Sequence, residues 1–363
     1  MDQRVNIILL GLGNVGSALL RQILGTREML RRRLGRQLVP VAVADISGVL
    51  FDPDGLPEAS MLAALEATAE GRFLHGLPGI LPLSMLGDAL RPGTILADLT
   101  ASPETGPTLQ AALDEGCNIV LANKIPLVQP WAEAQALLAT PRLRYEVTVG
   151  AGLPIIATLR TLLDTGDRVA AIEGCFSGTL GYLCAQLEGG EPYATAVHQA
   201  RALGYTEPDP REDLGGRDVA RKALILARTV RLSAPDATGW PLEMSDLSVE
   251  ALYPDSLTGV TTEAFMDAAA TLNETYADRF NAARAEGDTL RYVARISPED
   301  RDVGLTSVPK DSPLGALRGP ANYVAFHTKR YDDVPLVISG PGAGPEVTAA
   351  GVLGDVIDIV RQT

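Results

Sequence analysis

Residues 5–16 read VNIILLGLGNVG, and this stretch decides the fold of the first half of the chain. The apolar run at 5–10 is typical of a buried parallel strand, and a helical pattern follows at 17–24. The GxGxxG motif between them permits a tight turn and lets a pyrophosphate approach the helix N-terminus. It predicts dinucleotide binding, and the alternative is a tight turn that binds nothing. The predicted cofactor contacts in this motif are Gly11, Gly13, Asn14, Val15 and Gly16.

The composition is that of a folded globular protein. A length of 363 residues predicts two domains, and 46% hydrophobic with 21% charged residues excludes a disordered chain. No apolar run is long enough to span a membrane, and the chain enters its first strand without a signal or transit pattern, so we expect a cytoplasmic protein. A net charge of −14 argues against nucleic acids and anionic membranes as partners. The three cysteines and three histidines form no zinc motif.

A second strand at residues 39–44 ends at Asp45. A carboxylate there would bond the adenosine ribose and repel a 2′-phosphate, which favours NAD over NADP. The alternatives are an ordinary strand-end aspartate, or acceptance of a 2′-phosphate by neighbouring arginines. These arginines are Arg27, Arg31, Arg32, Arg33 and Arg36.

Three further strands of the first half deliver candidate residues to one edge of the sheet. The strand at 94–99 is followed by Thr100, and the strand at 118–121 leads to Lys124. Ligands bind at the carboxyl ends of such strands, so both residues are candidates for a cofactor site. The third strand runs into a glycine-rich turn, where Glu146 and turn carbonyls would suit a hard cation. The alternative for that turn is a buried hinge between domains.

The pattern changes after residue 168 to a mixture of helices and strands, with strands expected at 168–176 and near 290–296, 303–308 and 323–328. We expect an α/β protein with a Rossmann-type parallel-sheet domain at 1–150 and an α+β substrate and dimerisation domain at 151–338. The glycine-rich segment at 339–344 precedes an apolar helix, so residues 339–363 are expected to return to the first domain and to contact the cofactor through Gly342. The alternatives are a second anion cradle or a simple linker.

Residues 204–222 read GYTEPDPREDLGGRDVARK, an unusually acidic stretch that includes two prolines. Asp218 and Lys222 are four residues apart in a helical pattern and therefore share one face. The chain has only four lysines, and a lysine differs from an arginine in that it can give up its proton near neutral pH. The alternative is an acidic surface loop followed by an ordinary ion pair.

A nicotinamide-dependent dehydrogenase needs a group that exchanges a proton with the substrate hydroxyl. No histidine lies in a motif, zinc ligands are missing, and Cys117 and Cys175 lie at the edge of or inside apparent strands. Lys222 and Lys124 remain. The acidic stretch would attract a substrate ammonium, which indicates an amino acid or aminoaldehyde.

Seven stretches together resemble the homoserine dehydrogenase family. They are GLGNVG (11–16), DLTAS (98–102), LANK (121–124), YEVTVGAGLPII (145–156), FSGTLGYL (176–183), the acidic stretch (204–222) and GPGAGPEVTA (340–349). The resemblance implies an oxidoreductase that interconverts L-homoserine and L-aspartate 4-semialdehyde with NAD or NADP, on the route to threonine and methionine. Because the chain ends soon after the last glycine loop, we expect a short form without the C-terminal regulatory domain or the fused aspartate kinase that some members carry.

The resemblance further implies the role of each site residue. Lys222 would exchange the proton with the substrate oxygen, Lys124 would lie close to that oxygen, and Asp218 would orient the substrate or Lys222. The residues implied to bind the substrate are Glu207 and Asp213, at its amino group, and Gly178, Thr179 and Tyr205, which line the pocket. A sodium-like ion would be held by Glu146 with carbonyls of Val149, Ala151 and Leu153, and the protein would form a homodimer through its second domain.

Two rival functions remain from the sequence. One is a dehydrogenase of another amino-alcohol on the same scaffold, and the other is a dinucleotide-binding sensor without catalytic activity.

Overall fold

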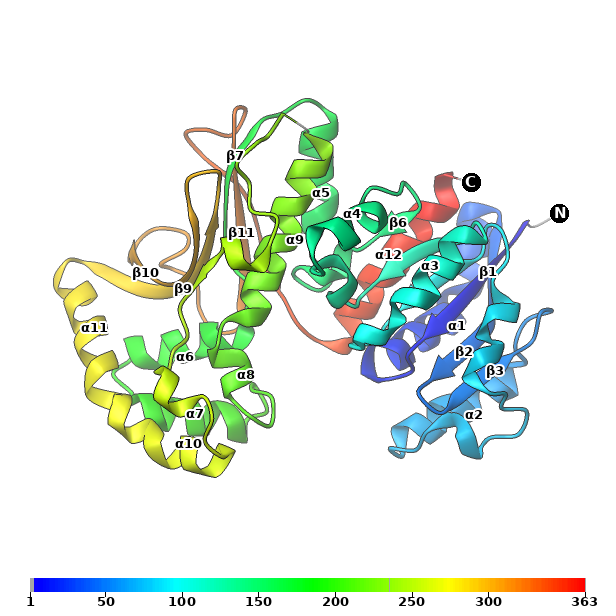
Figure 1. Cartoon of the computed structure of the whole chain (residues 1–363), viewed down its shortest axis with the longest axis horizontal. Coiled ribbons are helices and arrows are strands. Elements are labelled where there is room, and N and C mark those ends of the chain that lie inside the picture. The colour runs from blue at the N-terminus through cyan, green and yellow to red at the C-terminus, as the bar shows by residue number, and fades with distance from the viewer. Residues whose placement is uncertain (1–2, 235, 363) are drawn as a thin grey trace. The chain divides into compact units, whose positions relative to one another are not determined.

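The computed structural model describes residues 3–234 and 236–362, and it divides the chain into two compact units. Unit 1 comprises Met1–Gly152 and Ala343–Thr363, and unit 2 comprises Leu153–Gly342 (Figure 1). The sequence predicts boundaries after residues 150 and 338. The second boundary lies later in the structure because strand β12 (Leu336–Pro341) belongs to the sheet of unit 2.

Unit 1 is built on a six-stranded sheet with the strand order β3-β2-β1-β4-β5-β6. All neighbouring strands are parallel except β2 and β3, which form an antiparallel pair. The central strands are apolar and almost completely buried, as expected where helices cover both faces of a sheet. This confirms the predicted Rossmann-type sheet. The strands are β1 (Gln3–Leu10), β2 (Arg36–Asp45), β3 (Gly48–Phe51), β4 (Ile95–Asp98), β5 (Asn118–Leu121) and β6 (Leu143–Arg144).

Helices lie on both faces of this sheet, with α1 (Asn14–Leu34) and α12 (Pro345–Gln362) on one side and α3 (Gly106–Asp114) on the other (Figure 1). Helix α1 begins three residues before the predicted start, within the glycine motif, and ends at the left-handed Gly35. Its length explains why most of the arginines noted above are helical. The other helices of unit 1 are α2 (Glu58–Ala69) and α4 (Trp131–Leu138).

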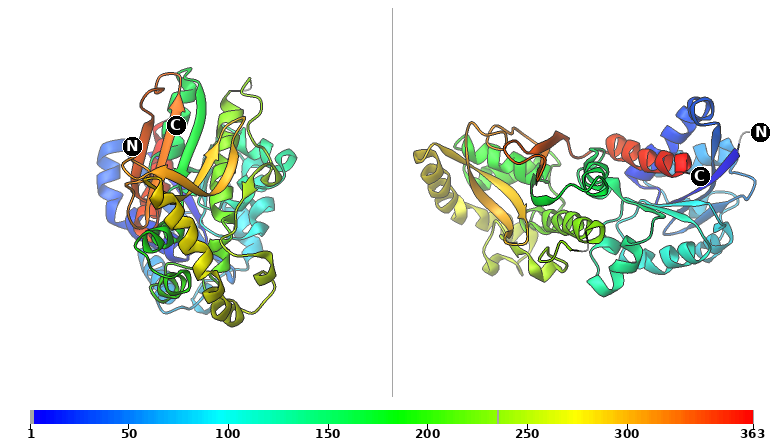
Figure 2. Two further views of the ribbon diagram at one scale, coloured as in Figure 1. Left: turned by 90° about the vertical axis from the view of Figure 1, so that its left-hand side faces the viewer. Right: turned by 90° about the horizontal axis from the view of Figure 1, so that it is seen from above.

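Helix α12 belongs to the core of unit 1 although it is the last element of the chain. Val352, Val356 and Ile359 of α12 join Leu19 and Ile23 of α1 in one buried apolar cluster. In Figure 2 the red C-terminal helix accordingly lies beside the blue N-terminal elements. The first unit is therefore completed only by the last residues of the chain.

Unit 2 contains a second six-stranded sheet with the order β12-β11-β7-β9-β10-β8. Its neighbouring strands are antiparallel except β8 and β10. The sequence identified four of these strands and missed β8 and β12. Besides β12, the strands are β7 (Val169–Cys175), β8 (Ser248–Val249), β9 (Asp288–Ile296), β10 (Arg301–Pro309) and β11 (Ala321–Thr328).

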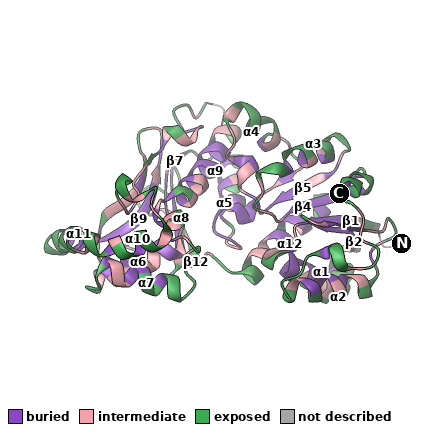
Figure 3. Cartoon of the chain, turned by 60° about the horizontal axis from the view of Figure 1, so that its bottom comes forward, coloured by how far each residue is buried: buried purple, intermediate pink, exposed green. Residues whose placement is uncertain are grey.

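Helix α9 (Arg217–Ser233) contacts β9 and is the most deeply buried helix of unit 2, as its purple colour in Figure 3 shows. The other helices of unit 2 are α5 (Ile155–Asp164), α6 (Gly178–Glu188), α7 (Tyr193–Ala202), α8 (Arg211–Leu214), α10 (Thr262–Ala268) and α11 (Asn273–Ala285). Within residues 3–234 and 236–362, no helix combines the length and the apolar character needed to cross a lipid bilayer.

Candidate functional site

A cavity of about 850 Å³ opens at the carboxyl ends of the unit 1 strands, beside the glycine loop. Gly11 adopts a left-handed conformation (φ +99°), and a Cβ atom there would lie 2.9 Å from Cγ2 of Thr100. A Cβ atom on Gly16 would lie 2.0 Å from the carbonyl oxygen of Gly11, so only glycine fits. Of the predicted cofactor contacts, the cavity is lined by Gly11, Gly13, Asp45 and Thr100. Asn14 and Val15 form the first turn of α1.

The carboxylate of Asp45 is held by three donors at the edge of this cavity. Its Oδ1 accepts from the backbone N–H (2.7 Å) and the hydroxyl (2.6 Å) of Ser47, and its Oδ2 accepts from the N–H of Leu74 (2.8 Å). These bonds fix the carboxylate, and they fasten the segment that carries Arg72 and Phe73, two further lining residues. No sequence pattern predicted these two residues.

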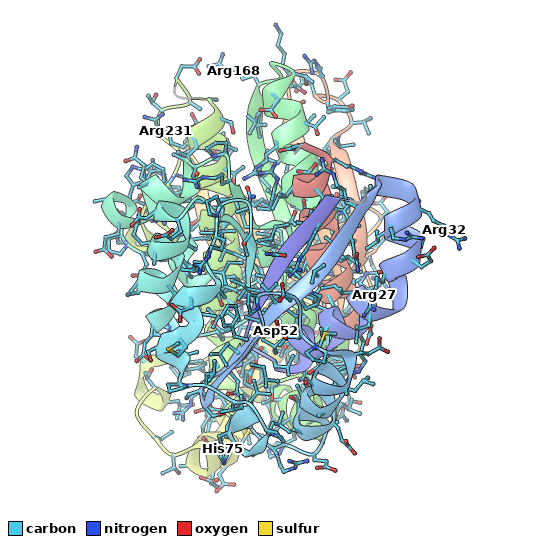
Figure 4. The ribbon with its side chains drawn as sticks, turned by 90° about the vertical axis from the view of Figure 1, so that its right-hand side faces the viewer. Arg27, Arg32, Asp52, His75, Arg168 and Arg231 are labelled. Carbon is cyan, nitrogen blue, oxygen red and sulfur yellow. The ribbon has the colours of Figure 1, made fainter. Side chains whose placement is uncertain are left out.

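The five arginines noted near Asp45 do not belong to the described lining of the cavity. Arg27 and Arg32 project from α1 (Figure 4), where they pair with Glu58 at 3.6 Å and Glu28 at 2.8 Å. Arg72 does line the cavity, and its guanidinium bonds Glu70. The carboxylate of Asp45 is therefore accompanied in the cavity by one arginine whose charge is already balanced.

The hydroxyl of Thr100 is engaged within the protein. It donates to Oδ1 of Asp98 at 2.7 Å and accepts from the N–H of Ser102 at 3.2 Å. Its backbone N–H also donates to Asp98, so Thr100 can meet a ligand through its methyl group or its carbonyl oxygen rather than through its hydroxyl.

Lys124 follows β5 and precedes a short 3-10 turn at Ile125–Leu127, with its side chain partly buried. Further along unit 1, Glu146 is buried, and its backbone N–H donates to Oδ2 of Asp355 at 2.9 Å. The following turn contains Ala151, the one non-glycine residue with positive φ (54°) within the described chain. Val149 and Ala151 thus belong to the same tight turn in unit 1 as Glu146, whereas Leu153 opens unit 2.

Lys222 lies on α9 in unit 2, with a side chain that is only 12% exposed. Its ammonium pairs with Oδ2 of Asp218 at 2.8 Å and donates to the carbonyl oxygen of Phe176 at 2.7 Å. The four-residue spacing read from the sequence produces this pair on one helix face. Phe176 follows β7, so the lysine is fixed between the helix and the sheet.

Asp213 is the centre of a second cluster in unit 2. Thr179, at the start of α6, donates to the carbonyl of Tyr205 (2.5 Å) and lies 3.1 Å from Oδ1 of Asp213. The N–H of Glu207 donates to Oδ2 of Asp213 at 2.8 Å. Burial raises the pKa of Asp213, and the charges of Glu207 and Asp218 add to this effect. The structure thus brings together four residues that the sequence predicted to bind the substrate.

The carboxylate of Asp209, in the acidic stretch, is paired within the protein. The guanidinium of Arg211 binds both oxygens of Asp209 and donates to the carbonyl groups of the loop at 257–260. This contact lowers the pKa of Asp209. The stretch is also not loop throughout, because residues 211–214 form the short helix α8. Asp209 therefore anchors a neighbouring loop.

The two remaining predicted glycines have packing roles. A Cβ atom on Gly178 would lie 3.2 Å from Cβ of Pro320. A Cβ atom on Gly342 would lie 1.9 Å from Cγ of Asn322, so a side chain at position 342 would overlap the buried amide of Asn322. The structure explains Gly342 by this contact within unit 2.

These features define a class of protein: a Rossmann-type unit joined to an α+β unit that carries a lysine–carboxylate cluster. The family model described as homoserine dehydrogenase matches residues 154–357. A homoserine dehydrogenase of Paracoccidioides brasiliensis is 40% identical over 284 residues, which are 74% of each chain. The chain belongs to the homoserine dehydrogenase family.

Two further relatives define the extent of the similarity. A bifunctional aspartokinase/homoserine dehydrogenase of Zea mays is 36% identical over 361 residues, which are 96% of this chain and 38% of the maize protein. The chain therefore spans well under half the length of that relative. The structure of a hyperthermophilic archaeal homoserine dehydrogenase mutant in complex with NADPH has a TM-score of 0.76 and 25% identity, with 99% of each chain covered.

Proposed function

We propose that this chain catalyses the NAD(P)-dependent interconversion of L-homoserine and L-aspartate 4-semialdehyde. The observation that carries the proposal is the Lys222 ammonium, which is held by Asp218 and the carbonyl of Phe176 in the unit that the family model matches. A nicotinamide dinucleotide, when bound, supplies or accepts the hydride.

Lys222 is suited to exchange the proton. An ammonium group has three N–H donors, and two of them are directed to Asp218 and Phe176. The third remains for the substrate oxygen. When the aldehyde is reduced, Lys222 gives this proton to the oxygen; when the alcohol is oxidised, neutral Lys222 takes the hydroxyl proton. Asp218 orients the amine in both directions, and Lys124 stays a predicted contributor from unit 1.

The acidic cluster of unit 2 suits the amino group of the substrate. Asp213 and Glu207 are joined through the N–H of Glu207, and both lie near the pocket residues Thr179 and Tyr205. A substrate ammonium would compensate the negative charges of these two carboxylates. The charge of Asp209 is already compensated by Arg211. We therefore assign amine recognition to Asp213 and Glu207.

The cavity of unit 1 suits the cofactor. Its glycine loop and the N-terminus of α1 fit a pyrophosphate, and the fixed carboxylate of Asp45 fits the adenosine ribose. The archaeal relative is described with NADPH, so we propose NAD(P) as the cofactor. Asp45 favours NAD.

A sodium-like cation, a homodimer and a cytoplasmic location stay predictions. Three of the four predicted cation ligands lie in one turn of unit 1, where the buried Glu146 adjoins the tight turn of Val149 and Ala151. In the described residues there is no group of three or more carboxylate, histidine or cysteine side chains that would hold a transition metal. Comparing turnover with and without sodium tests the cation, and light scattering tests the dimer.

The experiment that tests this proposal measures nicotinamide reduction with L-homoserine, in parallel with NAD and NADP. We expect turnover that Lys222→Ala lowers by at least about 100-fold, because general acid–base catalysis contributes roughly 10²–10⁴-fold. NADH affinity should be unchanged, since Lys222 acts on the substrate. Lys329→Ala, at an exposed lysine of the same unit, is the matched control.

A folded protein that binds NADH and leaves L-homoserine unchanged would contradict the proposal and favour another amino-alcohol as the substrate. Loss of NADH binding in Lys222→Ala would contradict the role of this lysine. The ratio of the rates with NAD and NADP decides the role of Asp45.

A further inference from the structure

Asp98 ends strand β4 with a side chain that is completely buried. Among the described residues, no lysine, arginine or histidine forms an ion pair with it. Neutral donors satisfy the carboxylate instead: the N–H (3.0 Å) and hydroxyl (2.7 Å) of Thr100 donate to Oδ1, and the amide of Asn123 (3.1 Å) donates to Oδ2. A buried carboxylate is costly unless it is bonded in this way. Its two oxygens both accept, which an asparagine could not do.

Asn123 is equally buried, and it joins the loops that follow β4 and β5. Besides Asp98, its amide nitrogen donates to the carbonyl of Ser102 at 2.8 Å and lies 3.3 Å from the hydroxyl of Thr105. Its Oδ1 accepts from the N–H of Ile125 at 3.1 Å, which is an Asx turn. Lys124 is the residue enclosed by that turn. The side chain of Asn123 therefore fixes the backbone from which Lys124 projects.

The same pair fixes Thr100 at the cofactor cavity. Both hydrogen-bonding groups of Thr100 bind Asp98, while its methyl group lies against Gly11 of the glycine loop. A change at Asp98 or Asn123 would therefore shift both Thr100 and Lys124, which we call the rim residues. Neither Asp98 nor Asn123 belongs to the described lining of the cavity.

We propose that Asp98 and Asn123 are positioning residues, whose mutual hydrogen bond holds Thr100 and Lys124 in place for the cofactor and for catalysis. The catalytic part rests on the proposed function. A displacement of about 1 Å at a reacting group can lower the rate about 100-fold, so the positions of these two rim residues matter for turnover.

The test exchanges the two side chains. Asp98→Asn places amide against amide, and Asn123→Asp places carboxylate against carboxylate, so each single variant loses the complementary pair. The double variant restores a donor facing an acceptor between positions 98 and 123, with the roles reversed, while the bond to the carbonyl of Ser102 stays lost. We expect each single variant to bind NADH about 10-fold more weakly and to lose about 100-fold in kcat. The double variant should exceed Asn123→Asp in kcat by at least about 10-fold, because it removes the contact between two carboxylates.

The controls separate positioning from general stability. Asn118→Asp makes the same substitution at the opposite end of β5 and should leave kcat and NADH affinity unchanged. Thermal unfolding of every variant shows the folded fraction. If a single variant does not fold, Thr100→Val removes the linking hydroxyl and keeps the shape, and we expect it to lower kcat about 10-fold.

Two results would overturn the inference: single variants whose folded molecules keep the kcat and NADH affinity of the unchanged protein, or a double variant that does not exceed Asn123→Asp. If no single variant folds, a Thr100→Val variant with unchanged kcat would also overturn the inference. Failure of the proposed function is distinguishable from these results. A protein that binds NADH without oxidising L-homoserine would refute the reaction, while the NADH affinities of the four proteins would still decide the positioning role.

Discussion

At the scale of single residues, Asp213 offers a pH dependence with a defined sign. Burial and two neighbouring carboxylates raise its pKa above the ordinary value of 3.8. The raised pKa means that the protonated side chain favours the folded state. This contribution to the free energy of unfolding is fully present below the ordinary pKa and is lost as the pH rises through the raised one.

Binding of a substrate ammonium requires the ionised form of Asp213. We therefore expect kcat/KM for L-homoserine to fall on acidification at a pH above the ordinary aspartate pKa. Asp213→Asn should remove this acidic limb and lower kcat/KM at neutral pH about 10- to 100-fold, because a hydrogen bond to a charged group contributes about 1.5–3 kcal/mol. The measurement is a pH profile of kcat/KM.

The control for this profile is Glu212→Gln, at an exposed position of the same short helix. An acidic limb that persists in Asp213→Asn, or that disappears equally in Glu212→Gln, would contradict the assignment of the limb to Asp213.

The residues of the site differ in how far the sequence could predict them. Asp218 and Lys222 were predictable because helix geometry brings residues four apart together. The contact of Thr179 with Asp213 joins residues 34 positions apart, so local patterns carry no signal for it. Asp98 and Asn123 stood inside the motifs noted above, yet their role depends on which strands are neighbours. That adjacency appears only in the sheet.

At the scale of elements, α12 contains two glycines with opposite surroundings. A Cβ atom on Gly351 would lie 2.5 Å from Cγ1 of Val147 and 3.1 Å from Cα of Gly152, whereas a Cβ atom on Gly354 would meet no atom within 4 Å. Both lie inside one helix, where alanine is favoured over glycine by roughly 0.5–1 kcal/mol. The two positions therefore form a matched pair.

We expect Gly354→Ala to raise the free energy of unfolding by about 0.5–1 kcal/mol. Gly351→Ala should lower it, because overpacking costs about 1–3 kcal/mol and exceeds the gain in helix propensity. Urea titration of both variants measures the difference. Equal stabilisation by both substitutions would show that α12 does not press against the turn at residues 150–152.

The predictability of the elements follows their length and regularity. The strand, glycine loop and helix at the start of the chain were correct in type because apolar periodicity and glycine spacing are local signals. Strand β8 has only two residues, and helix α8 has four, too few to establish a period. Strand β12 was missed because its GP sequence at 340–341 resembles a linker, and its pairing with β11 outweighs that local preference.

At the scale of the whole molecule, the two units carry different parts of the proposed reaction. The described lining of the cofactor cavity belongs to unit 1, while the lysine–carboxylate cluster lies in unit 2. Each unit has its own sheet and its own buried residues. Each ligand should therefore stabilise a different set of residues, and amide hydrogen exchange can report this difference.

We expect NADH to slow exchange at the glycine loop and at residues 71–74 of unit 1, and L-homoserine to slow exchange at residues 205–214 of unit 2. At a ligand concentration of 100 Kd, binding adds about 2.7 kcal/mol to openings that abolish the site, which corresponds to roughly 100-fold slower exchange. Helix α11, which belongs to neither set, is the internal control within each experiment. Protection by NADH that is confined to unit 2 would refute the assignment of the cofactor to unit 1. Protection by L-homoserine that spares residues 205–214 would refute the role of the acidic stretch, because a ligand must slow the openings that destroy its own binding site.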